Sequence, residues 1–281
     1  MSLSVCVLAS GSTGNATLVS DGQTHLLVDC GLVAREIETR MLRAGFDPRG
    51  LAGVLITHAH TDHFRSAGTL AYRYGAPIYV DPAADRAIRE RPSNGSYHRV
   101  RKSLPIPESI GGIRVETFAT SHHVWGGTPV GFVLSAGGAR VGVMTDTGTV
   151  SSEALKLLAG CQALVLEANY DKDTVSAKLG DRRYAMDWRY LEWVASDHGH
   201  LSNDQCAQFL ARIAGTETMH VFLAHISENH ADQRKDNNSF EKAEQTVREF
   251  FSREGLSLPP LHRTYRRGAT EGQASILVRI D

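Results

Sequence analysis

The sequence predicts an α/β fold in which two β-sheets face each other and helices cover both outer sides, a four-layer αββα sandwich. Two strand-rich blocks, in the opening third and at residues 104–146, each lead into alternating strands and helices. No linker rich in proline or serine separates the two blocks. Two facing sheets with outer helices would bury both apolar faces of each sheet. We therefore predict a single domain that spans residues 1–281.

Apolar runs bounded by glycine, asparagine and aspartate predict the strands. These runs lie at residues 3–9, 16–20, 24–31, 53–57, 77–80, 111–120, 129–136, 139–146, 163–168, 220–226 and 273–280. Apolar residues at helical spacing, such as Val33, Ile37 and Met41 on one face, predict the helices. The helices are expected at residues 33–44, 64–74, 82–90, 151–159, 204–214 and 239–252.

The composition is that of an ordinary globular protein, with 42% hydrophobic and 22% charged residues. Thirty Lys and Arg against 31 Asp and Glu leave a formal charge of −1, so any basic footprint for nucleic acid must be local. The start resembles no secretory signal, and no apolar stretch is long enough to span a membrane. The four cysteines form no CxxC pair, which favours reduced thiols and a cytoplasmic location. The oligomeric state is left open.

The stretch THAHTDH at residues 57–63 packs three histidines and an aspartate behind a predicted strand. His58 and His60 are two residues apart, so an extended loop would point both the same way. Asp62 and His63 are adjacent and could reach a second point if the chain turns into a helix there. A solvated or buried histidine-rich loop is the alternative, but mixed nitrogen and oxygen ligands with open positions are typical of a catalytic metal.

This pattern resembles the metallo-β-lactamase superfamily, and the superfamily's remaining motifs follow in the expected order. They are Asp29 in LLVDCG, His122 in FATSHH, Asp146 in VMTDTG and His225 in FLAHIS. The resemblance implies two ligand sets that share Asp146, with Asp29 supporting the site from behind. The first set is His58, His60, His122 and Asp146, and the second is Asp62, His63, Asp146 and His225. His123 stays open as an alternative to His122.

Such a ligand set implies two divalent metal ions, manganese or zinc, that share a bridging water. A metal ion can lower the pKa of bound water from 15.7 towards about 7, which makes hydroxide available for hydrolysis. We predict that Asp62 is a catalytic residue as well as a metal ligand. Glu167 in LVLEAN and His200 in GHLSN resemble the pair that relays a proton to the leaving oxygen in phosphodiesterases such as RNase Z. A positioned acid of this kind typically gains about 10²–10⁴-fold in rate.

Several segments together resemble the YycJ (WalJ) group of the superfamily: LASGSTGNATLV, LLVDCGL, ITHAHTDHF, LEANYD, GHLSN and LAHISENHA. That resemblance implies a 5′-to-3′ exonuclease on double-stranded DNA, with manganese commonly bound. Alternatives are an RNA-processing nuclease, a thioester or lactone hydrolase, and a binding protein that has lost turnover. The chain departs from the group at His122-His123 and Tyr170-Asp171, each where the group has His-Asp, and residues 172–197 are longer than expected.

Other features are candidates for substrate contact, each with a purely structural alternative. The turn SGSTGN brings Ser12 and Asn15 near the site, or is a simple hairpin. Ser202 and Asn203 begin a helix through a capping box, and could also present backbone N–H groups to a phosphate. The basic candidates for a phosphate backbone are the Lys and Arg residues from Arg86 to Lys102, and Arg263, Arg266 and Arg267. Tyr184, Trp188 and Leu191 recur at helical spacing, which favours core packing over base stacking.

Overall fold

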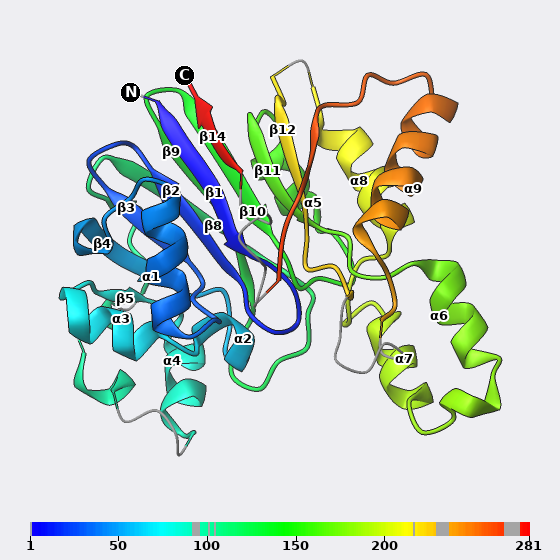
Figure 1. Cartoon of the computed structure of the whole chain (residues 1–281), viewed down its shortest axis with the longest axis horizontal. Coiled ribbons are helices and arrows are strands. Elements are labelled where there is room, and N and C mark those ends of the chain that lie inside the picture. The colour runs from blue at the N-terminus through cyan, green and yellow to red at the C-terminus, as the bar shows by residue number, and fades with distance from the viewer. Residues whose placement is uncertain are drawn as a thin grey trace.

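Two β-sheets pack face to face in the computed structural model, which describes residues 2–91, 96–100, 102–103, 105–215, 217–228, 236–266 and 276–281. Figure 1 shows the two sheets in the middle of the molecule, with helices on the outer side of each. The predicted four-layer αββα arrangement is therefore confirmed.

The first sheet contains both ends of the described chain. Its order is β14 (Leu277–Ile280), β1 (Leu3–Ala9), β2 (Ala16–Ser20), β3 (His25–Val28), β4 (Leu51–Leu55), β5 (Ile78–Tyr79) and β6 (Lys102–Ser103). Neighbours from β14 to β3 are antiparallel, and neighbours from β3 to β6 are parallel. Residues 273–275 of the predicted last strand lie outside the described residues.

The second sheet is built from the later part of the chain. Its order is β13 (Leu261–Arg263), β12 (His220–Ala224), β11 (Ala163–Glu167), β10 (Ala139–Met144), β9 (Val130–Ala136), β8 (Ile113–Ala119) and β7 (Ser109–Ile110). Strands β10 to β13 are parallel to their neighbours, whereas β7 to β10 form an antiparallel meander. The short strands β7 and β13 were not predicted, because two or three residues show no clear alternation.

Helices cover the outer face of each sheet. The first sheet is covered by α1 (Ala34–Arg43), α3 (Ala67–Tyr74) and α4 (Pro82–Arg89), and the second by α5 (Ser152–Leu158), α8 (Asn203–Ile213) and α9 (Phe240–Arg253). These six correspond to the predicted helices. None of the described helices is long and apolar enough to cross a membrane.

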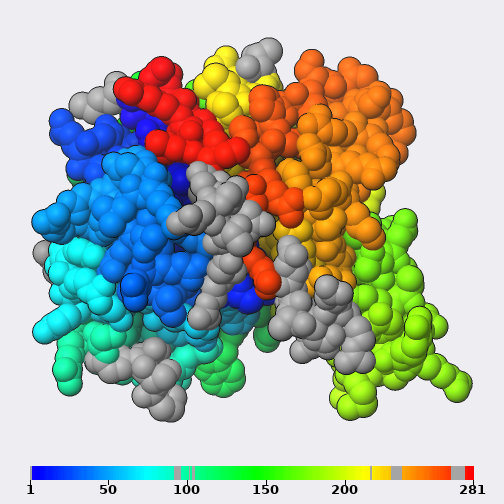
Figure 2. All heavy atoms as spheres, in the orientation of Figure 1, coloured from blue at the N-terminus to red at the C-terminus, as the bar shows by residue number. Residues whose placement is uncertain are grey.

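Two regions differ from the predicted helices. The helix expected at 64–74 is divided into α2 (Thr61–Phe64) and α3, because Ser66 leaves the helical conformation to hydrogen-bond Cys30 and Leu32. Residues 172–197 form α6 (Lys172–Leu179) and α7 (Trp188–Val194), which were not predicted. These two helices project from the body of the sandwich at the lower right of Figures 1 and 2.

The sheets meet through a core of aliphatic and aromatic side chains from both inner faces. It includes Val5, Val7, Leu26, Phe132, Leu134 and Val165. The parallel strands β3 and β4 of one sheet and β10, β11 and β12 of the other end at a common edge of the sandwich. Ligands in α/β proteins bind at such carboxyl ends, and the loops that follow these strands contain the predicted site residues.

Candidate metal centre

Histidine and carboxylate side chains from both sheets meet at this edge. Their ligand-type atoms lie within 4.8 Å of one another in four overlapping groups. The groups are His58, His60 and His122; Asp62, His63 and His225; His58, His63 and Asp146; and Asp146, Glu167, His200 and His225. All nine of the predicted ligands and relay residues therefore belong to one continuous cluster.

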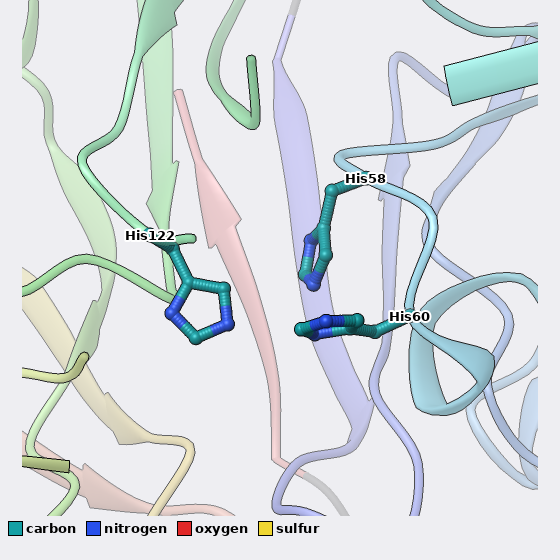
Figure 3. A group of neighbouring side chains, drawn as sticks. All are labelled: His58, His60 and His122. Carbon is teal, nitrogen blue, oxygen red and sulfur yellow. The ribbon is translucent and has the colours of Figure 1, made fainter. Parts of the chain in front are cut away.

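The first three histidines form one half of the cluster. Figure 3 shows His58 and His60 on the loop after β4 and His122 on the loop after β8, with their rings pointing toward one another. His122 Nδ1 donates to the backbone oxygen of Gly199 at 2.8 Å, which leaves its Nε2 for the cluster. Burial and the neighbouring His122 lower the pKa of His60 to about 4, so this group is neutral near pH 7, the form that binds metals.

The structure separates the two candidates for the third motif. The side chain of His122 is buried in the cluster, whereas that of His123 is exposed. The backbone N–H of His123 donates to the backbone oxygen of His198 at 3.0 Å, which fixes the chain with His122 facing inward. Of these two residues, only His122 is near the other ligand-type atoms.

Asp62, His63 and His225 form the other half. Helix α2 begins at Thr61, so the backbone changes direction there. Asp62 and His63 therefore point to a different part of the cluster from His58 and His60. Asp62 Oδ2 lies 3.5 Å from His63 Nε2 and 3.8 Å from His225 Nε2. Burial alone would lower the pKa of His225, but Asp146 and neighbouring carboxylates raise it to about 10. This half of the cluster therefore attracts positive charge.

Asp146 faces both halves. Its Oδ1 atom lies 3.7 Å from His122 Nε2 and 3.5 Å from His225 Nε2, and its Oδ2 atom lies 3.3 Å from His63 Nε2. The carboxylate is buried and follows β10 directly. One side chain thus has an oxygen near each group of three, which is the arrangement that a bridging ligand requires.

Asp29 lies behind the cluster and orients one of its histidines. Its Oδ2 atom accepts a hydrogen bond from His63 Nδ1 at 2.7 Å, which leaves His63 Nε2 toward Asp62 and Asp146. The Thr57 N–H and hydroxyl donate to Asp29 at 2.9 and 3.0 Å, and the same hydroxyl lies 3.0 Å from His58 Nδ1. Thr57 was not predicted, although it opens the histidine-rich stretch.

Three site residues have a strained backbone. Asp29, Asp146 and His225 have φ of 61°, 57° and 52°, and they are the non-glycine residues with positive φ in the described ranges. This conformation costs an ordinary residue roughly 1–2 kcal/mol and clusters at functional sites. The strained residues also explain why β3, β10 and β12 end before residues 31, 146 and 226, where the predicted strands end. Each observed strand stops just before its strained turn.

Glu167 and His200 form a buried pair beside Asp146. Glu167 Oε1 accepts from His200 Nδ1 at 2.7 Å, and its Oε2 accepts from the Thr147 N–H at 2.9 Å. Burial would raise the pKa of Glu167, but the charge and hydrogen bond of His200 lower it to about 2. Glu167 is therefore an anion at neutral pH, and it fixes the proton on the Nδ1 atom of His200.

Residues 172–197 help to place both His122 and His200. The His200 N–H donates to the backbone oxygen of Val194 at 2.9 Å, at the end of α7. Gly199 allows this approach, because a Cβ there would lie 2.1 Å from the Trp193 oxygen. Since the Gly199 oxygen in turn accepts from His122 Nδ1, the end of α7 positions two histidines of the cluster.

The predicted substrate residues have different environments. Asn15 Nδ2 lies 3.1 Å from His63 Nε2 and 3.4 Å from Asp62 Oδ2, so this side chain touches the cluster, whereas Ser12 is exposed. Ser202 caps α8 in the expected capping box. The Asn203 amide is buried and exchanges two hydrogen bonds with the amide of Asn238.

Asn169 was not predicted as a site residue. Its Nδ2 atom lies 3.0 Å from His225 Nδ1 and also donates to the His225 backbone oxygen at 2.8 Å. The amide therefore holds the ring and the strained backbone of this residue together. Asn169 lies within the LEANYD segment that resembles the YycJ (WalJ) group, and this resemblance was the signal that could have identified it as a site residue.

Most of the basic candidates that are described have protein partners. Arg89 pairs with Asp85, and Arg263 pairs with Glu228 and Glu241. Arg101 and Arg267 lie outside the described residues. Of the three residues at helical spacing, Leu191 packs with Val194 in a small core, which agrees with core packing for that position, whereas Tyr184 and Trp188 are half-buried.

The buried donor atoms fit a divalent cation. His58 Nε2, Asp146 Oδ2 and His225 Nε2 are buried and make no hydrogen bond to any described residue. A buried polar atom without a partner costs about 1–3 kcal/mol. Cations in the two halves of the cluster would satisfy these atoms, and mixed imidazole and carboxylate ligands suit zinc and manganese.

Comparison with known proteins identifies the family. Residues 24–226 match the family model described as "Beta-lactamase superfamily domain". The chain belongs to this superfamily. Its members share the metallo-β-lactamase fold, so the predicted fold family and the prediction of a hydrolase are confirmed.

Two relatives are similar to the chain over most of its length, and one solved structure shares its fold. The chain is 31% identical over 259 residues to exodeoxyribonuclease YycJ of Bacillus anthracis, covering 92% of each chain. It is 30% identical over 244 residues to exodeoxyribonuclease WalJ of Streptococcus pneumoniae, covering 86% of this chain and 85% of that one. The metallo-β-lactamase fold protein YhfI from Bacillus subtilis superposes with a TM-score of 0.67 at 14% identity, covering 99% of each chain.

Proposed function

We propose that the protein is a phosphodiesterase that depends on two divalent metal ions and degrades DNA as a 5′-to-3′ exonuclease. The observation that supports this most is the buried Glu167–His200 pair, which adjoins the metal cluster at Asp146. An alkoxide leaving group is a strong base, so its departure gains from a positioned acid. Hydrolysis of a thioester or lactone would not need such a relay.

The two halves of the cluster are the proposed metal sites. His58, His60 and His122 would hold one ion, Asp62, His63 and His225 the other, and Asp146 would contact both. Manganese or zinc bound there would supply an activated water and stabilise negative charge on the phosphoryl oxygens. Asp29 and Asn169 keep His63 and His225 in the orientations that these sites require.

His200 is the proposed proton donor to the leaving oxygen. Its Nδ1 proton is held by Glu167, so Nε2 is the atom that can exchange a proton with substrate. The anionic Glu167 fixes the orientation of the His200 ring through this buried hydrogen bond. Glu167 also accepts from Thr147 and therefore cannot rotate away without losing that bond.

The choice of DNA rests on the relatives. Two proteins named exodeoxyribonucleases match the chain over 92% and 86% of its length at about 30% identity. Cys6, Cys30, Cys161 and Cys206 are buried thiols outside any disulfide in the described structure, which supports a reducing, cytoplasmic location, where such a substrate is present.

A panel of end-labelled DNA and RNA tests this function. We expect Mn²⁺-loaded protein to release mononucleotides from 5′-phosphorylated duplex DNA, with products that shorten from the 5′ end. Parallel reactions with Zn²⁺, and with RNA of the same sequence, identify the preferred metal and sugar. Absence of nucleotide release from every DNA, combined with rapid hydrolysis of a small thioester or lactone, would reject the proposal.

A further inference from the structure

Helix α7 places two aromatic side chains next to the metal cluster. The Trp193 ring lies 5.3 Å from the His122 ring and 5.4 Å from the His200 ring, measured between centroids. The Tyr190 ring lies 5.9 Å from Trp193, with only 30° between the ring planes. A row of rings therefore runs outward from the proposed proton donor to Tyr190.

The outer ring of this row is not needed for the core. Tyr190 is 53% exposed, although exposed aromatic rings are unfavourable in water. The packing of α7 comes from Leu191 and Val194, which join Tyr170 and Val175 in a separate buried cluster. Tyr190 thus has no packing role that accounts for an aromatic residue at this position.

The negative charge of the cluster also acts on the outer ring. Partial burial and the negative charge of Asp62 raise the pKa of the Tyr190 hydroxyl. The inner end of the row adjoins His122 and His200, and Tyr190 is its outer end. A nucleotide whose phosphate lies at the cluster would have its base within reach of this row.

We propose that Tyr190 and Trp193 form a stacking platform for the nucleobase next to the phosphodiester that is cut, an inference that rests on the proposed nuclease function. Stacking on aromatic rings is tolerant of sequence, because every base has a π-face, and removal of one ring typically weakens binding about 5- to 150-fold. The platform would hold the end of the strand while His200 serves the leaving oxygen. It gives residues 172–197 a role in substrate binding as well as in positioning His200.

The test uses Tyr190, because Trp193 contacts residues of the catalytic cluster. Tyr190→Ala removes the ring, Tyr190→Phe keeps it, and Tyr72→Ala is the matched control, since Tyr72 is a 73% exposed tyrosine on α3 at the other side of the molecule. Each metal-loaded variant is tested on duplex DNA whose first or second nucleotide is intact or abasic. Binding is measured separately with a cleavage-resistant terminal linkage.

We expect Tyr190→Ala to raise both KM and Kd about tenfold for intact DNA, with kcat and bound metal unchanged. Tyr190→Phe and Tyr72→Ala should behave as the wild type. At one of the two positions, the abasic nucleotide should weaken binding to the wild type but add little to Tyr190→Ala, because both changes remove the same contact.

Two other outcomes overturn the proposal and are distinguishable. If the wild type cleaves DNA but Tyr190→Ala binds it as well as Tyr72→Ala does, the stacking platform is wrong and the nuclease function stands. Additive effects of Tyr190→Ala and the abasic nucleotide at both positions have the same meaning. If the wild type neither binds nor cleaves DNA, the nuclease function fails, and the platform fails with it.

Discussion

Asp146 connects the two halves of the candidate metal centre through a single carboxylate. Its oxygens lie 3.3–3.7 Å from His63, His122 and His225, and Oδ2 has no hydrogen bond in the described structure. Many neighbouring histidines hold the pKa of Asp146 well below its usual range despite burial. The residue is therefore an anion whose natural partner is a cation.

Asp146→Asn should remove that charge while keeping the shape of the side chain. We expect affinity for divalent metal to fall by more than about 100-fold, which exceeds the usual loss when a partner behind a metal ligand is removed. Elemental analysis after dialysis against limiting Zn²⁺ measures this loss. Asp173→Asn, on the exposed side of α6, is the control, and equal metal content in the two variants would contradict the bridging role.

His200→Ala should separate proton donation from metal binding. We expect kcat on DNA to fall about 100-fold or more with bound metal unchanged, because the leaving alkoxide loses its acid. Hydrolysis of thymidine 5′-(p-nitrophenyl phosphate), whose leaving group needs no proton, should fall less than tenfold. Equal losses on both substrates would show that His200 acts only through the structure of the cluster.

At the level of elements, the site depends on where strands end. The strands at 3–9 and 16–20 could be predicted to the residue, because their apolar runs stop at turn-forming residues. The bounds of helices α6 and α7 could not be predicted. These helices bury few apolar side chains, such as Val175 and Leu191, and the helical spacing of Tyr184, Trp188 and Leu191 covers too few positions to fix their ends. The contact between α7 and the His122 loop joins distant segments, which no local pattern encodes.

Gly199→Ala should test the link between α7 and the site. Its new Cβ would lie 2.1 Å from the Trp193 oxygen and 2.4 Å from the Val194 oxygen, so the loop bearing His200 must move. We expect kcat/KM to fall about 100-fold, as displacement of a catalytic group by ~1 Å can cause. The free energy of unfolding should fall by only ~1–3 kcal/mol.

The matched control for this change is Gly215→Ala, where an added Cβ meets no atom within 4 Å. Kinetics and denaturant unfolding of both variants provide the comparison. If Gly199→Ala keeps wild-type kcat/KM, then α7 does not position His200.

In the whole molecule, the sandwich joins two sheets whose loops supply complementary ligands. Asp62 and His63 follow the first sheet, whereas Asp146 and His225 follow the second. The residues that meet in the cluster, and their order along the chain, could be predicted from motifs in the sequence. Their supporting contacts, such as Thr57 with Asp29 and Asn169 with His225, required the three-dimensional structure, because each joins residues 28 or 56 positions apart.

Metal removal should therefore loosen the contact between the two sheets. A ligand at 100 times its Kd stabilises the folded state by about 2.7 kcal/mol, so we expect a chelator to lower Tm by roughly 5 °C or more. Differential scanning calorimetry with and without EDTA measures this shift. An unchanged Tm, with the metal shown to be removed, would mean that the cluster does not connect the sheets.

Anomalous diffraction from zinc-loaded crystals tests the dinuclear centre most directly. We expect two anomalous peaks, one about 2.0–2.2 Å from ligand atoms of His58, His60 and His122, and the other at the same distance from Asp62, His63 and His225. Asp146 should contact both peaks. A single peak, or peaks outside ligand distance of Asp146 and His225, would contradict a centre that both sheets build.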